Sequence, residues 1–129
     1  MSILIVDDEV SILTMTRKLL EVKGYEVATC VSARDAQAMM REVSFQLVLT
    51  DIVMPDIDGL ELIQWIRENY PATKVIAFSG NSRLDPGNYL HIAGVMGAVR
   101  TLRKPLEAST LLTAVKALTD APPETSKDA

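Results

Sequence analysis

Hydrophobic and polar positions along the chain follow two patterns that alternate. Short apolar runs, typical of buried strands, are separated by longer stretches in which apolar residues recur at helical spacing. The predicted strands are residues 2–6, 25–30, 45–50, 74–78 and 98–102. The predicted helices are residues 10–22, 33–42, 59–68, 88–94 and 107–119. The pattern therefore predicts a repeated alternation of strand and helix.

Residues with special backbone roles support several of these boundaries. Gly24 ends the first predicted helix, Ser32 is a suitable N-cap for the second, and Asp58-Gly59 opens the third. The segment 80–88 is rich in Asn, Ser, Asp, Pro and Gly, which predicts a loop. The final stretch, "DAPPETSKDA", has two prolines and no apolar period, so we expect it to be disordered.

Strand–helix alternation of this kind is typical of an α/β fold with helices on both faces of a parallel sheet. Because crossover connections are right-handed, few topologies remain. We expect a doubly wound, five-stranded parallel sheet with strand order 2-1-3-4-5, in which ligands bind at the carboxyl ends of the strands. We expect one domain over residues 1–120, followed by a disordered tail over 121–129.

Composition narrows the classes of partner. The 129 residues include 13 basic and 17 acidic side chains, and the resulting net charge of -4 argues against nucleic acid as a direct partner. The single cysteine, Cys30, cannot form an internal disulfide, which fits a reducing cytoplasm. No apolar run reaches transmembrane length and no signal peptide is recognisable, so we expect a cytoplasmic location without a membrane partner.

Acidic residues stand where two of the apolar runs end. Asp7 and Asp8 follow "ILIV", and Asp51 follows "FQLVLT". Two unit charges about 4 Å apart repel by roughly 4 kcal/mol at an effective dielectric constant of about 20. Such a cluster must hold protons or a cation, and a solvent-accessible all-oxygen site suits Mg²⁺. The alternative is that Asp7 and Asp8 only cap the helix that follows them.

Two further polar residues follow the last two predicted strands. Ser79 supplies a hydroxyl and Lys104 supplies an ammonium group. Metal, ammonium and hydroxyl together form a cradle for the oxygens of a phosphoryl group. Asp51 is then the candidate nucleophile, because an aspartate can carry a phosphoryl group as an acyl phosphate. Gly59 is expected to let the backbone turn tightly beside this site.

Four motifs occur together in a characteristic order: "ILIVDDE", "DIVMPDIDG", "FSG" and "RKP". With this set the chain resembles the receiver domain of response regulators in two-component signalling, over about residues 2–119, and in particular receivers that stand alone. The resemblance implies the flavodoxin-like fold. It implies that Asp51 accepts a phosphoryl group, that Ser79 is the switch hydroxyl and that Lys104 pairs with the phosphoryl group.

The same resemblance implies a metal site and partners. Asp8 and Asp51 would supply metal carboxylates, the backbone carbonyl of Val53 would be a further ligand, and Asp7 would act through water on Mg²⁺. The phosphoryl donor would be a sensor histidine kinase or a histidine phosphotransfer protein. The output would be a protein–protein contact or a phosphorelay step, and the chain would not be an enzyme beyond its own phosphorylation and dephosphorylation.

Two alternatives remain open at this point. The family carries a switch aromatic where this chain has Thr101, which leaves room for an interaction module that works without phosphorylation. A phosphatase or phosphotransferase with an aspartyl nucleophile would need a second acid two residues after Asp51, and Val53 occupies that position and cannot transfer a proton.

Overall fold

The computed structural model describes residues 2–52, 59–79, 92–104 and 106–119. The strands are β1 (Ser2–Val6), β2 (Glu26–Cys30), β3 (Leu47–Asp51), β4 (Lys74–Ser79) and β5 (Arg100–Arg103). The helices are α1 (Val10–Val22), α2 (Ala33–Glu42), α3 (Gly59–Asn69) and α5 (Ala108–Thr119). Residues 92–96 are also helical. The alternation predicted from the sequence is therefore confirmed across the described chain.

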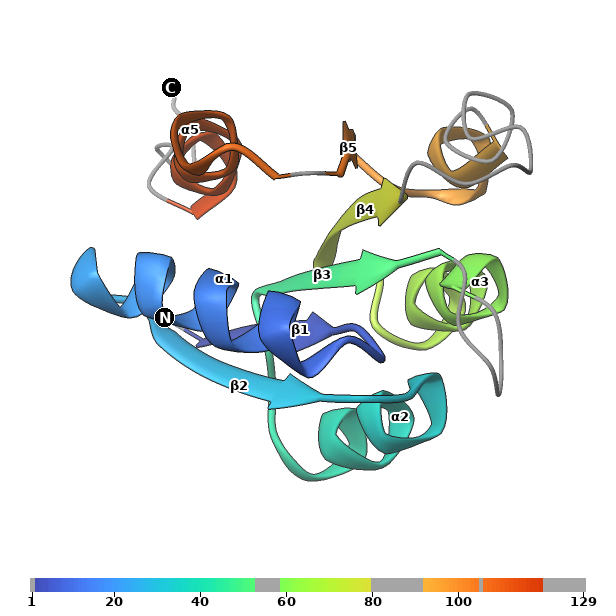
Figure 1. Ribbon diagram of the computed structural model, residues 1–129. Coiled ribbons are helices and arrows are strands. Elements are labelled where there is room, and N and C mark those ends of the chain that lie inside the picture. The colour runs from blue at the N-terminus through green and yellow to red at the C-terminus, as the bar shows by residue number, and fades with distance from the viewer. Residues whose placement is uncertain (1, 53–58, 80–91, 105, 120–129) are drawn as a thin grey trace, which may run out of the picture.

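The five strands form one parallel sheet in the order β2-β1-β3-β4-β5, as predicted (Figure 1). The pairing register brings the carboxyl ends of neighbouring strands level with one another. Asp51 at the end of β3 pairs with Phe78, and Ser79 at the end of β4 pairs with Arg103. This level edge is where the polar strand-end residues meet.

The helices cover both faces of the sheet (Figure 1). Ile3 and Ile5 face a core that includes α1 and α5, whereas Leu4 and Val6 face a core that includes α2 and α3. Side chains alternate between the two faces of a strand, and all four of these residues are fully buried. The continuous apolar run of β1 is therefore the signature of a central strand that is covered on both faces.

Two helix boundaries have the local chemistry predicted for them. The Ser32 hydroxyl accepts a hydrogen bond from the Asp35 backbone N–H at 3.1 Å, which caps α2. Gly24 follows α1 with φ of +93°, a conformation that favours glycine. None of the described helices is long and apolar enough to cross a membrane.

Strand β5 begins at Arg100, two residues later than the prediction of 98–102. The backbone N–H of Ala98 donates to the Ala93 carbonyl at 2.9 Å, so this residue closes the preceding helical turn. Gly97 has φ of +133° and redirects the chain there. The predicted helix 88–94 overlaps the helical residues 92–96, and its earlier part, the loop 80–88 and the tail 121–129 lie outside the described residues.

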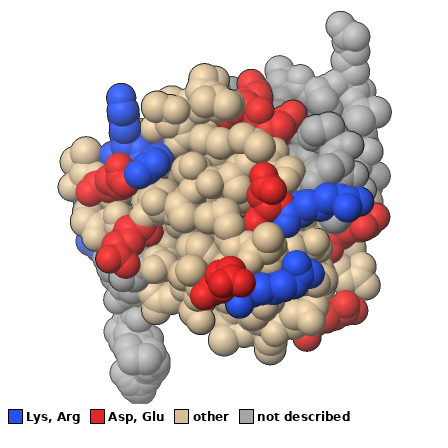
Figure 2. Space-filling view, turned by 90° about the horizontal axis from the view of Figure 1, so that it is seen from below, with Lys and Arg blue, Asp and Glu red and all other residues tan. Residues whose placement is uncertain are grey.

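Figure 2 views the molecule from the side of β2 and α2. On this face, the described Lys and Arg side chains adjoin Asp and Glu side chains and do not gather into a basic patch. One exposed ion pair of the described chain joins Arg17 and Glu21 on α1 at 3.0 Å.

Candidate functional site

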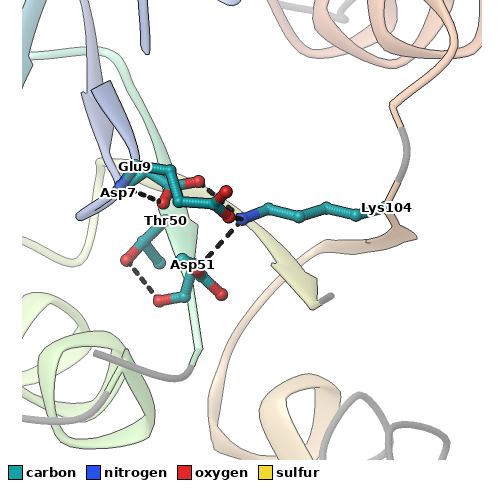
Figure 3. Close-up of polar contacts among 5 residues, drawn as sticks. All are labelled: Asp7, Glu9, Thr50, Asp51 and Lys104. Atoms are coloured by element: carbon teal, nitrogen blue, oxygen red, sulfur yellow. Dashed lines mark hydrogen bonds and ion pairs between the residues drawn. The ribbon is translucent and has the colours of Figure 1, made fainter. Parts of the chain in front are cut away.

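The carboxyl edge of the sheet brings together the strand-end residues that the sequence singled out. Asp7 follows β1, Asp51 ends β3, Ser79 ends β4 and Lys104 follows β5. In Figure 3, Asp7, Asp51 and Lys104 point toward one another from these separate strands. The convergence expected from the parallel topology is therefore present in the structure.

Lys104 lies at the centre of the polar contacts (Figure 3). Its Nζ atom is 2.7 Å from Asp7 Oδ2, 3.1 Å from Asp51 Oδ2 and 3.3 Å from Glu9 Oε1. The same ammonium lies 5.3 Å from the centre of the Phe78 ring, within the range of a cation–π contact. One cation therefore faces three carboxylates and an aromatic ring.

Asp7 is fully buried and is held from two sides. Its Oδ1 atom accepts a hydrogen bond from the Glu9 backbone N–H at 2.9 Å. Its Oδ2 atom makes the 2.7 Å ion pair with Lys104, although no donor in the described part of the chain meets this oxygen in hydrogen-bonding geometry. The N-cap position of α1 belongs to Glu9, so Asp7 is not the cap of this helix.

The electrostatic balance of this cluster is visible in two pKa shifts. Burial raises the pKa of the Asp7 carboxyl from 3.8 to about 6; Asp51 adds to the rise, while Lys104 and the Glu9 N–H oppose it. Burial alone would lower the pKa of the Lys104 ammonium, but Asp7 and Asp51 outweigh burial and raise it. Lys104 is therefore charged at neutral pH, and the site still carries excess negative charge.

Asp7, Asp8 and Asp51 each offer a carboxylate oxygen, and these oxygens lie within 4.8 Å of one another. Asp7 and Asp51 are buried, whereas Asp8 is exposed and opens the cluster to solvent. A set of three carboxylates that includes a buried oxygen without an aligned donor fits a hard divalent cation. Val53, whose carbonyl the family resemblance implies as a ligand, lies outside the described residues.

Ser79 is buried at the end of β4, beside the lysine. Its backbone carbonyl accepts a hydrogen bond from the Lys104 N–H at 2.8 Å, which extends the β4–β5 pairing past the last residue of β5. The backbones that carry the hydroxyl and the ammonium are thus tied together directly.

The backbone around Asp51 is fixed by its neighbours. The Thr50 hydroxyl donates to the Asp51 carbonyl at 2.9 Å, and the Ile52 N–H donates to the Phe78 carbonyl at 3.1 Å. Gly59 approaches this backbone so closely that a Cβ atom there would overlap the Asp51 carbonyl oxygen and the Ile52 Cα. Among the described residues, the glycines with positive φ are Gly24 and Gly97. Glycine is therefore needed at position 59 because of the close approach to the Asp51 backbone, and not because of its φ angle.

Two residues of the site were not singled out from the sequence for these roles. Glu9 belongs to the acidic stretch after β1, but its contact with Lys104 depends on how α1 and β5 lie in space. Phe78 was part of the fourth predicted strand and of the motif "FSG", without a role of its own, although its ring lies beside the ammonium of Lys104. Thr101 is exposed on β5, and Arg100 and Arg103 are exposed on the same edge strand.

Comparison with known proteins gives a consistent match. A family model described as the response regulator receiver domain matches residues 3–116. The transcriptional regulatory protein ZraR of Salmonella typhimurium is 37% identical over 109 residues, which cover 84% of this chain and 24% of that protein. The CAI-1 autoinducer sensor kinase/phosphatase CqsS of Vibrio cholerae is 35% identical over 115 residues, which cover 89% of this chain and 17% of that protein. This chain thus spans a quarter or less of both relatives.

Solved structures agree on the fold. A CheY-like response regulator receiver domain protein from Methanospirillum hungatei has a TM-score of 0.87 and 32% identity, covering 97% of this chain and 98% of that one. The beryllofluoride-activated NtrC4 receiver domain dimer has a TM-score of 0.84 and 32% identity, and the match covers 92% of this chain and 96% of that chain.

Proposed function

Because this chain belongs to the response regulator receiver family, we propose that it accepts a phosphoryl group on Asp51 from a histidine phosphodonor. The observation that carries the proposal is the contact between Asp51 Oδ2 and Lys104 Nζ at 3.1 Å, inside a cluster of carboxylates. When a carboxylate beside an ammonium forms an acyl phosphate, the ammonium is already in place to pair with the negative charge of the added phosphoryl group.

The proposed transfer is a displacement at phosphorus. A carboxylate oxygen of Asp51 forms a bond to phosphorus while the bond between phosphorus and the donor's histidine nitrogen breaks. The donor's phosphohistidine ring carries a proton on its other nitrogen, so the nitrogen that takes the electron pair leaves as part of a neutral imidazole. Lys104 supports this step because its positive charge lies next to Asp51, where the phosphoryl oxygens would bind. Positioning and electrostatic stabilisation account for most of the catalysis of phosphoryl transfer.

We propose Mg²⁺ as the cation of the site. Asp8 and Asp51 would be direct carboxylate ligands, Asp7 would act through water, and the Val53 carbonyl would complete the protein ligands. When bound, Mg²⁺ supplies positive charge that offsets the phosphoryl oxygens. The clustering of carboxylate oxygens within 4.8 Å supports this assignment.

The proposed response to phosphorylation begins at Ser79. Its hydroxyl would engage the phosphoryl group from a strand end that is hydrogen-bonded to Lys104. Since Thr101 offers no ring to follow this movement, we propose that the change is carried mainly by the segment between Ser79 and β5. Output would be a protein contact or a phosphorelay step.

The proposed partners are a sensor histidine kinase or a histidine phosphotransfer protein, in the cytoplasm. We propose no direct contact with nucleic acid or membrane for this segment, which has a net charge of -4. Its proposed organisation is a receiver domain over 1–120 and a tail over 121–129, with no chemistry beyond its own phosphorylation and dephosphorylation.

The test is phosphorylation by a small phosphodonor with Mg²⁺, read by intact mass. Wild-type protein should gain one base-labile phosphoryl group, and Asp51→Asn should gain none. Asp35→Asn, which removes an exposed aspartate outside the cluster, is the matched control and should label normally. Equal labelling of Asp51→Asn would remove Asp51 from its proposed role. Absence of label on the wild-type protein would favour the interaction module that Thr101 leaves open.

A further inference from the structure

The carboxylate of Glu9 reaches across the site to the lysine that the proposed phosphoryl transfer uses. Glu9 and Lys104 are 95 positions apart in sequence, yet Glu9 Oε1 accepts a hydrogen bond from Lys104 Nζ at 3.3 Å (Figure 3). A lysine ammonium has three N–H donors and no acceptor. Asp51 and Glu9 accept hydrogen bonds from that ammonium, and Asp7 makes an ion pair with it, so three carboxylates share one ammonium.

The three contacts differ in strength. The Asp7 and Asp51 side chains are 0% and 7% exposed and lie 2.7 and 3.1 Å from Nζ. The Glu9 side chain is 60% exposed and is the most distant at 3.3 Å. Water weakens an exposed ion pair far more than a buried one. The Glu9 contact is therefore the one that the ammonium gives up most easily.

The backbone of Glu9 fixes where its side chain begins. The Glu9 N–H is held by Asp7 Oδ1, and the residue is the extended N-cap of α1. N-cap side chains commonly accept a hydrogen bond from the first turn of their helix, but the Glu9 side chain makes no such bond within the described chain. Its carboxylate is directed to Lys104 instead.

We propose that Glu9 is a positioning residue that competes with the incoming phosphoryl group for the Lys104 ammonium and so restrains phosphorylation of Asp51. This inference rests on the proposed function. As the bond from Asp51 to phosphorus forms and the donor's bond to phosphorus breaks, the transferred oxygens need an N–H of Lys104. Of the two carboxylates that accept a hydrogen bond from Lys104, Glu9 is the more exposed and the more distant, so its contact is the easier one to replace. The Glu9 charge repels the phosphoryl oxygens until its side chain moves away.

The decisive comparison is Glu9→Gln against Glu42→Gln. Both variants remove one exposed negative charge, but Glu42 lies at the end of α2, outside the contacts of Lys104. With Mg²⁺ and acetyl phosphate, Glu9→Gln should be phosphorylated roughly two- to five-fold faster than wild type, the factor that corresponds to an exposed ion pair. Glu42→Gln should match wild type, and the gain should shrink at high salt.

A second donor separates competition at Lys104 from simple repulsion of an anionic donor. Phosphoramidate carries less negative charge than acetyl phosphate but transfers the same phosphoryl group. The gain in Glu9→Gln should persist with phosphoramidate. A gain seen only with acetyl phosphate, or a rate at or below that of wild type with both donors, would overturn the proposal.

A measurement without donor tests the contact itself. The ammonium protons of Lys104, followed by nitrogen-15 NMR, should exchange with water roughly two- to five-fold faster in Glu9→Gln, since one acceptor has lost its charge. Unchanged exchange would overturn the role of Glu9 even if Asp51 is phosphorylated normally. Failure of the wild-type protein to take label on Asp51 would instead overturn the proposed function, and this inference with it.

Discussion

The ammonium of Lys104 lies 2.7 Å from the fully buried carboxylate of Asp7, and the two residues follow strands at different positions in the sheet, β5 and β1. This one positive charge does not neutralise the carboxylates around it, because Asp51 and Glu9 contact the same ammonium. Asp8 adds a further charge to the cluster. Burial raises the pKa of Asp7 to about 6, and the charge of Asp51 adds a smaller contribution.

The raised pKa of Asp7 predicts a specific dependence of stability on pH. Between about pH 4 and pH 6 the folded protein holds a proton that the unfolded chain has released, so the free energy of unfolding falls as pH rises through this interval. Asp7→Asn should remove this fall. It should raise the free energy of unfolding above pH 6 by at most about 3 kcal/mol without metal. Urea unfolding in a chelator, across this pH range, measures both effects.

Glu42→Gln is the control for this experiment, because Glu42 is exposed on α2 and lies outside the cluster. It should keep the pH dependence of the wild-type protein. A free energy of unfolding that falls as steeply in Asp7→Asn as in wild type would show that Asp7 is not the group responsible.

Divalent cations should stabilise the fold through the same cluster. Mg²⁺ that binds only the folded protein adds about 2.7 kcal/mol at a concentration about 100 times its dissociation constant. Asp8→Asn removes the exposed carboxylate and should lose most of this gain, while its stability without metal should rise because repulsion is relieved. Melting temperature against Mg²⁺ concentration measures both. An identical Mg²⁺ response in wild type and Asp8→Asn would exclude Asp8 as a ligand.

Much of this architecture could be predicted because strong physical patterns specify it. The apolar run of β1 identifies a strand buried on both faces, and the strand–helix alternation then fixes a parallel sheet. In such a sheet the carboxyl ends of the strands share one edge, so Asp7, Asp51, Ser79 and Lys104 had to meet there.

The features that escaped prediction depend on distances that sequence patterns do not carry. The reach of Glu9 to Lys104 depends on the spacing between the start of α1 and the end of β5. The late start of β5 depends on the hydrogen bond from the Ala98 N–H to the Ala93 carbonyl. Because of this bond, Ala98 belongs to the end of the preceding helical turn and not to the strand. The first is a tertiary contact, and the second is a local helix-end geometry around Gly97 that the apolar strand pattern did not reveal.

A buried hydroxyl on α1 offers a test of the core. Thr16 is fully buried, and its Oγ1 atom has no hydrogen-bond partner among the described residues. Thr16→Val keeps the shape of the side chain and removes the unsatisfied group, so it should raise the free energy of unfolding by about 1 kcal/mol. Thr50→Val should have the opposite sign, because the equally buried Thr50 hydroxyl donates to the Asp51 carbonyl at 2.9 Å. Chemical denaturation of both variants checks the pair, and a loss of stability in Thr16→Val would contradict the assignment.

Gly59 connects the start of α3 to the backbone that carries Asp51. Its N–H donates to the Ile52 carbonyl at 2.6 Å, and a Cβ atom there would overlap the Asp51 carbonyl oxygen. Backbone atoms cannot yield as a flexible side chain can, so Gly59→Ala must push α3 away from β3 or displace Asp51. We expect a loss of about 2 to 3 kcal/mol in the free energy of unfolding.

The matched control is Gly94→Ala, because Gly94 lies in the helical segment 92–96 and a Cβ atom there would have no other atom within 4 Å. Alanine is favoured over glycine in a helix, so this variant should gain about 0.5 to 1 kcal/mol. The same alanine substitution should therefore change stability in opposite directions at the two glycines. Gly59→Ala should also phosphorylate more slowly than its stability alone explains, when assayed where it remains fully folded, since the displaced backbone carries the proposed nucleophile. Wild-type stability and rate in Gly59→Ala would show that α3 does not depend on this close approach.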